Sequence, residues 1–363
     1  MNKVSKILSG ALCLALSSYS VYSDININST INDIYSLPLV KGQLSFKASY
    51  YKISNDFDIF GSVKSSTENY VLIGDSSGGG FRLSYGISEY ASIYYNFDYL
   101  DIDLGDSSLK NKKNDLFARV NLYQNDDFFI NSVSFDIGYK INKGSDVEIK
   151  SDLMLNAIIR SVFPGSHFYI YDGVIKYNGF SGSIYDKNGN KIYPFIKIED
   201  LEDRTSYFRL LFGKKFSSGM IDFYFGYKNI NIETNFNVYP KNNPVIQETL
   251  KKVGIDKVKF NKDEKVIVAG LSYLYNLNDY IFELNYEYSK SDRDVENSLN
   301  SNDNHVFNLT VSKPLNSNFI VYVGGAFMLN GLNADIPYLY NTYIKTDEKY
   351  GYFKLGFLYN FTY

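Results

Sequence analysis

The stretch YGYFKLGFLYNFTY, residues 350–363, decides the fold that this sequence predicts. Its large apolar side chains, which share one face of an extended strand, are Phe353, Leu355, Phe357, Tyr359, Phe361 and Tyr363. The opposite face carries Tyr352, Lys354, Gly356, Asn360 and Thr362. A period of two along the chain predicts a β-strand with one apolar and one polar face.

The same alternation recurs in segments spread over the chain, at 81–87, 221–227, 282–288 and 307–311. After the N-terminal region, no stretch holds about 18 consecutive apolar residues, so the sequence contains no candidate for a helical membrane span. A bilayer offers no hydrogen-bond partners to the backbone, and strands therefore cross it only as a closed barrel. The pattern predicts an all-β protein with a closed antiparallel barrel.

Aromatic residues make up 17% of the chain, with 35 Tyr and 27 Phe but no Trp. Abundant tyrosine suits an aromatic girdle at the two membrane interfaces, where the ring is in the headgroup zone and the hydroxyl stays in water. Composition alone fits a tyrosine-rich soluble β-protein equally well. The formal net charge of −3 argues against a nucleic-acid partner.

The N-terminus has the features of an export signal. Lys3 and Lys6 precede a short apolar run, and small residues follow near Ser23. We predict a signal peptide over residues 1–23. Its removal takes away Cys13, the single cysteine, and leaves a mature chain without disulfides.

Short turns alternate with longer, more polar connections along residues 42–363, which is the asymmetry of periplasmic turns and extracellular loops. The predicted strands number about fourteen and lie near 42–53, 79–88, 91–103, 115–123, 130–141, 148–160, 166–177, 205–215, 219–233, 263–275, 280–290, 303–312, 318–330 and 348–363. Residues 24–41 are predicted to form a periplasmic lead-in or a small plug.

Two connections, 178–204 and 234–262, are longer than a turn requires, and we predict that they have structure of their own. In the second, Asn243 and Pro244 offer a helix start, and Gly254 offers an end. We predict a short amphipathic helix there, over the barrel mouth or folded into the lumen.

A strand that ends the chain on an aromatic residue resembles the C-terminal strand of bacterial outer-membrane β-barrel proteins. The resemblance is porin-like and covers the whole mature chain in pattern. It implies the outer membrane of a Gram-negative bacterium, contact with its lipids and lipopolysaccharide, and recognition by the barrel-assembly machinery. The residues that the resemblance assigns to the assembly signal are Phe357, Tyr359, Phe361 and Tyr363.

If the apolar faces point to lipid, the opposite faces line the interior. The charged residues predicted there are Lys47, Arg82, Asp98, Arg119, Asp136, Lys140, Lys150, Asp152, Arg160, Arg209, Asp222, Lys228, Glu283, Glu287 and Lys354. Two interpretations remain open: an aqueous pore with a transverse field, or an interior closed by salt bridges. Because about eight strands already make a barrel that side chains can fill, a wider barrel favours the pore.

The function that this architecture predicts is passive passage of ions or small solutes, with no cofactor and no metal site. A surface-display barrel that acts through its loops is the main alternative, and a transporter of long-chain lipids is a third. The outer-membrane enzyme families generally use histidine as a base. Here His167 is next to a turn and His305 falls on an outward face, so catalysis is not predicted.

Overall fold

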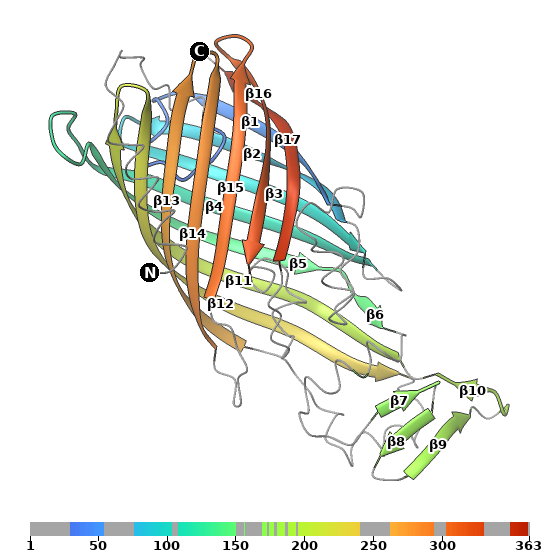
Figure 1. Cartoon of the computed structure of the whole chain (residues 1–363). Coiled ribbons are helices and arrows are strands. Elements are labelled where there is room, and N and C mark those ends of the chain that lie inside the picture. The colour runs from blue at the N-terminus through green and yellow to red at the C-terminus, as the bar shows by residue number, and fades with distance from the viewer. Residues whose placement is uncertain are drawn as a thin grey trace, which may run out of the picture.

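The computed structural model describes most of the chain beyond the N-terminal region (Figure 1). The described residues are 30–53, 76–103, 108–149, 156, 169–172, 174–177, 180–185, 188–193, 195–239, 262–293, 303–329 and 349–361. The predicted signal peptide, residues 1–23, lies outside these ranges.

Twelve strands close into an antiparallel barrel, so the predicted all-β barrel is confirmed. In ring order they are β1 (Leu44–Ile53), β2 (Ser76–Ser88), β3 (Ala91–Asp103), β4 (Ser108–Gln124), β5 (Ser132–Gly144), β11 (Phe195–Lys215), β12 (Gly219–Tyr239), β13 (Lys262–Leu277), β14 (Tyr280–Arg293), β15 (Asp303–Pro314), β16 (Phe319–Leu329) and β17 (Lys349–Phe361). The ring closes where β1 pairs with β17, with Leu44 opposite Phe361.

Two of the fourteen predicted strands do not belong to the ring. Where 148–160 was predicted, residues Val147–Ile149 form the short strand β6, which pairs with β11 beyond the ring. Where 166–177 was predicted, β7 (Tyr169–Tyr171) and β8 (Val174–Tyr177) form part of a separate sheet. Strands this short cannot cross a bilayer, which takes about 9–11 residues, but alternation over a few residues does not reveal that difference.

The separate sheet has four strands and lies beyond the ends of β11 and β12 (Figure 1). Its other strands are β9 (Phe180–Tyr185) and β10 (Lys191–Ile192). The connection 178–204 has structure of its own, as expected: it contains β9 and β10. It also contains the first half of β11, so this ring strand begins earlier than the predicted residue 205. Likewise β12 continues to Tyr239, into the predicted loop 234–262. The helix predicted at 243–254 lies outside the described residues.

The two ends of the barrel differ, as predicted. At one end the turns are short, at 89–90, 216–218, 278–279 and 315–318. Most connections at the other end are longer, such as 145–194 between β5 and β11. The N-terminal approach to β1 and the end of β17 both lie at the short-turn end, because β1 and β17 pair antiparallel there.

Alternate residues of each strand point into the ring or away from it. On β2, Arg82 and Ser84 are buried, whereas Leu83 and Tyr85 are exposed. The outward residues form aromatic contacts between strands, such as Phe46 with Phe81 and with Phe357. The inward residues are mostly small, polar or charged. This segregation follows directly from the period of two in the sequence.

Residues 30–40, which we call the lumen segment, pass through the interior of the ring before the chain turns into β1. Their partners lie on strands from opposite sides of the ring, including β4 and β14. Ile31 and Tyr35 are each 1% exposed. The segment has no regular secondary structure, so its backbone groups find partners on the inward side chains of the barrel.

Candidate functional site in the barrel lumen

A buried ion cluster spans three adjacent strands. Asp136 on β5 lies directly opposite Arg119 on β4 and opposite Arg209 on β11. The two oxygens of Asp136 accept hydrogen bonds from Nε and Nη2 of Arg119 at 2.7 and 2.9 Å. Arg209 Nη2 is 2.8 Å from Asp136 Oδ2. One carboxylate thus holds two guanidinium groups in fixed positions.

Arg119 also binds the lumen segment. Its Nη2 donates to the backbone carbonyl of Asp33 at 2.7 Å, and its Nη1 donates to the carbonyl of Tyr35. The hydroxyl of Ser134 donates to the next carbonyl, that of Ser36. The segment therefore turns the backbone oxygens of Asp33, Tyr35 and Ser36 towards β4 and β5.

Two carboxylates on strands β12 and β14 bind backbone amides of the lumen segment. Glu283 on β14 accepts from the amides of Ile31 and Asn32 at 2.6 and 2.9 Å. Asp222 on β12 accepts from the amide of Ser36 at 2.7 Å. We call Glu283 and Asp222 the acidic wall. The segment is held largely by its main chain: three amides bond this wall, and the amide of Leu39 bonds Ser92 on β3.

Three more cations come from neighbouring strands β17, β1 and β2. Lys47 and Arg82 are directly opposite each other across β1 and β2. Each contacts a backbone carbonyl of the lumen segment, Lys47 that of Ile31 at 3.2 Å and Arg82 that of Thr30 at 3.4 Å. Lys354 Nζ is 3.5 Å from Asn32 Oδ1. We call the full set the cationic wall: Lys47, Arg82, Arg119, Arg209 and Lys354.

Asp33 is the acidic residue that the lumen segment brings among these cations. Burial raises the pKa of its carboxyl, but four cations outweigh burial and hold the pKa well below its ordinary value. They are Arg82, Arg209, Lys47 and Arg119. These cations therefore favour the ionised form of the Asp33 carboxyl.

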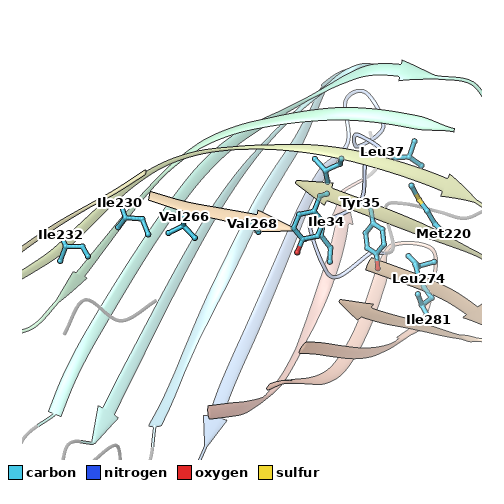
Figure 2. Close-up of a cluster of buried hydrophobic side chains, with 12 residues drawn as sticks. Ile34, Tyr35, Leu37, Met220, Ile230, Ile232, Val266, Val268, Leu274 and Ile281 are labelled. Atoms are coloured by element: carbon cyan, nitrogen blue, oxygen red, sulfur yellow. The ribbon is translucent and has the colours of Figure 1, made fainter. Parts of the chain in front are cut away.

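Apolar contacts with the ring also hold the lumen segment (Figure 2). Ile34, Tyr35 and Leu37 belong to a buried cluster with inward residues of the ring. These ring residues include Leu211, Met220, Tyr224, Leu274 and Ile281. Burying aliphatic and aromatic surface contributes about 25 cal/mol per Å², so the cluster adds to the polar contacts of the segment.

A small cavity of about 20 Å³ remains beside the segment. It is bordered by Arg82, Arg119, Asp33 and Tyr94, among others. A space of this size admits about one water molecule.

The remaining predicted lining residues that the structure describes occupy inward positions further along the strands. Asp98 pairs with Lys113 at 3.2 Å, and Lys228 with Glu287 at 3.2 Å. Lys140 is on the inward face of β5, opposite Asp115. Lys150, Asp152 and Arg160 lie outside the described residues. The assignment of the whole set to a pore lining stays a prediction.

The sequence did not predict that Asp33 lies among the residues of the cationic wall. Nor did it single out Tyr224 and Glu264 as inward residues. The lumen segment has no periodic pattern that could place it. Glu264 on β13 and Tyr224 on β12 stand at alternate positions that face the interior, so assigning every residue of each strand to the inward or outward face would have found both.

Phe357, Tyr359 and Phe361 of the predicted assembly signal lie on the outward face of β17, where Tyr359 packs on Phe361 with ring centroids 4.8 Å apart. Tyr363 lies outside the described residues, as does His167. His305 is on the outward side of β15, and its Nδ1 is 2.9 Å from the hydroxyl of Tyr286.

Within the described ranges, no helix has the length and apolar character to span a membrane. In the same part of the chain, no three His, Cys, Asp or Glu side chains gather in a way that could hold a metal ion.

No protein-family model and no curated protein matches the sequence. Solved structures do match. The translocator domain of the autotransporter NalP from Neisseria meningitidis aligns with 98% of this chain and 96% of its own, at 9% identity and a TM-score of 0.45. The NanC porin aligns with 87% of this chain and 98% of its own, at 7% identity and a TM-score of 0.42.

A FadL homologue of Pseudomonas aeruginosa aligns with 88% of this chain and 90% of its own, at 9% identity and a TM-score of 0.43. These proteins are outer-membrane β-barrels, the class that the sequence resembles. Their likeness to this chain is one of fold and assigns it no activity.

Proposed function

We propose that this chain is an outer-membrane barrel that serves as a passive channel for ions or small solutes, and that the lumen segment is a plug that closes it. The observation that carries the proposal is the segregation of side chains by the ring. Apolar residues such as Leu284 and Phe223 are exposed outside, while charged residues such as Arg119 and Asp136 are buried inside.

The outer surface supports placement in a membrane. In water, a continuous band of exposed aliphatic and aromatic side chains would drive association. In lipid the same band is favourable, and the closed ring satisfies every strand edge. The short-turn end then faces the periplasm and the longer connections face the cell exterior.

Interactions with other components follow from the same placement. We propose that outer-membrane lipids and lipopolysaccharide contact the outward faces of the strands, and that the barrel-assembly machinery recognises the aromatic end of β17.

The width of the ring supports a passage. About eight strands already make an interior that side chains can fill, and this ring has twelve. The extra space contains the lumen segment, whose polar contacts come from several strands. Opening therefore requires the segment to leave, and its contacts set the free energy of that step.

The alternative is a closed barrel that displays its long connections at the cell surface. The observation that favours it is the extent of the contacts of the lumen segment, which is bound by both walls and by the apolar cluster. The two functions differ in one respect that can be measured: whether the segment ever vacates the lumen.

A disulfide lock in the full chain tests this. The hydroxyls of Ser36 in the lumen segment and Ser132 on β5 are in hydrogen-bond contact, so the double variant Ser36→Cys/Ser132→Cys brings two sulfurs close together. The purified protein is inserted in a planar bilayer, and conductance is recorded before and after a reductant is added.

We expect the oxidised lock to be silent and the reduced form to conduct in steps. The single variant Ser36→Cys is the matched control and should ignore the reductant. Conductance unaffected by the lock would refute the plug. The surface-display barrel would be favoured if no conductance is seen for the wild type, the reduced double variant or the single variant, with insertion confirmed by protease protection.

A further inference from the structure

We infer that the lumen contains a binding site for small organic carboxylates, which Asp33 occupies as a tethered competitor. The inference rests on the proposed function and deepens it, because it names the class of solute that releases the plug.

The first observation is the excess of positive charge on one side of the ring. Asp136 already contacts both Arg119 and Arg209. Lys47 and Arg82 stand opposite each other on neighbouring strands, where like charges repel. Asp33 borders the same small cavity as Arg82 and Arg119, and Arg119 binds its backbone carbonyl at 2.7 Å, so its side chain brings a carboxyl group into this cluster. When the segment leaves, the cations stay, because they belong to the barrel strands.

The second observation is an unsatisfied guanidinium. Arg82 is 4% exposed, and its Nε and Nη1 have no hydrogen-bond partner. It borders the cavity beside Asp33 and Arg119. A guanidinium offers five donors in a fork that matches a carboxylate. The free Nε and Nη1 groups of Arg82 can therefore donate to an anion, which fits there once the lumen segment has left.

The acidic wall narrows the class of ligand. Glu283 and Asp222 accept backbone amides of the lumen segment, and they would accept O–H or N–H donors of a solute in the same way. A simple anion such as chloride leaves these acceptors unused. The two walls together select a carboxylate that carries hydroxyl or amide donors on its far side.

Ligand binding to the lumen and departure of the lumen segment are thermodynamically linked. A solute that binds only the vacated lumen raises the vacated fraction by a factor of 1 + [L]/Kd. Organic carboxylates with donors should therefore open the plug in proportion to their concentration. A neutral polyol, which cannot replace Asp33 at the cationic wall, should not.

The test follows exposure of the plug in the full chain and needs no conduction. In the variant Ser36→Cys, whose position is buried, the rate of maleimide labelling reports how often the segment leaves. The probe is sodium gluconate, with sorbitol and with sodium chloride at equal ionic strength as controls. We expect the labelling rate to rise linearly with gluconate and to stay flat with both controls.

Two further substitutions on the same background identify the site. Arg82→Met should abolish the dependence on gluconate. The matched control Lys215→Met, which removes a cation paired with Asp126 near a short turn, should retain it. Equal responses to gluconate and sorbitol, or equal slopes in the two variants, would overturn the inference.

The outcome separates the inference from the proposed function. Labelling that responds to gluconate in a barrel that never conducts supports the carboxylate site and refutes the channel. A barrel that conducts but whose labelling ignores gluconate supports the channel and refutes the site.

Discussion

Glu283 on β14 accepts a hydrogen bond from the backbone amide of Ile31 at 2.6 Å, across 252 positions of the sequence. The same carboxylate accepts from Asn32. One side chain of the ring therefore binds two consecutive amides of the lumen segment, and its replacement should weaken the attachment of the proposed plug.

Glu283→Gln should loosen the lumen segment. A glutamine offers one carbonyl where the carboxylate offers two acceptors, so a buried amide is left unsatisfied at a cost of about 1–3 kcal/mol. We expect faster maleimide labelling of Ser36→Cys on this background. The control is Glu264→Gln on β13, where the buried carboxylate accepts from Ser291 instead. Equal labelling rates in the two variants would contradict the role given to Glu283.

Asp136→Asn should destabilise the barrel itself. The substitution leaves Arg119 and Arg209 buried without their shared counter-charge, and breaking a buried ion pair from one side costs about 3–5 kcal/mol. Urea unfolding in lipid vesicles, followed by circular dichroism, measures the loss. Asp126→Asn changes an exposed carboxylate in a short turn and should leave the midpoint nearly unchanged. A midpoint for Asp136→Asn as high as that of the control would refute the prediction.

Leu284→Arg tests the lipid-facing surface. Leu284 is exposed on the outer wall, and an arginine near mid-bilayer costs about 2–4 kcal/mol. The unfolding free energy in vesicles should fall by that amount. Leu315→Arg, at an exposed position in a short turn, should have little effect. If both variants are equally stable, the outer wall does not face lipid.

Replacing Phe361 and Tyr363 by serine should slow insertion into outer-membrane vesicles that contain the assembly machinery. The reason is the proposed reading of the aromatic end of β17 by that machinery. The yield of protease-protected barrel measures the effect. Phe129→Ser removes an aromatic side chain that is 80% exposed in the β4–β5 turn and should insert like the wild type. Undiminished insertion of the double variant would remove the assembly signal.

The ring was predictable because strand parity is a local property. Arg82 and Leu83 are neighbours in sequence, and alternation alone assigns them to opposite faces. The two strands predicted in excess, at 148–160 and 166–177, failed because alternation carries no information about whether a strand pairs within the ring.

The site was predictable only in part. Parity placed Arg119, Asp136 and Arg209 inside, but their contact depends on the register of three strands, which no local pattern gives. The position of Asp33 depends on the path of an irregular segment, whose conformation is imposed by distant side chains. Long-range partners decide both, and a single sequence does not display them.

The pairing of β1 with β17 has a consequence for the order of events during folding. The interior exists only once the first and last strands have met, so the cationic and acidic walls cannot face each other in a half-formed ring. The lumen segment precedes β1 by only a few residues and travels with it to the seam. We therefore expect its hydrogen bonds to β12 and β14 to form only as the ring closes, so that the barrel is completed with the segment already inside.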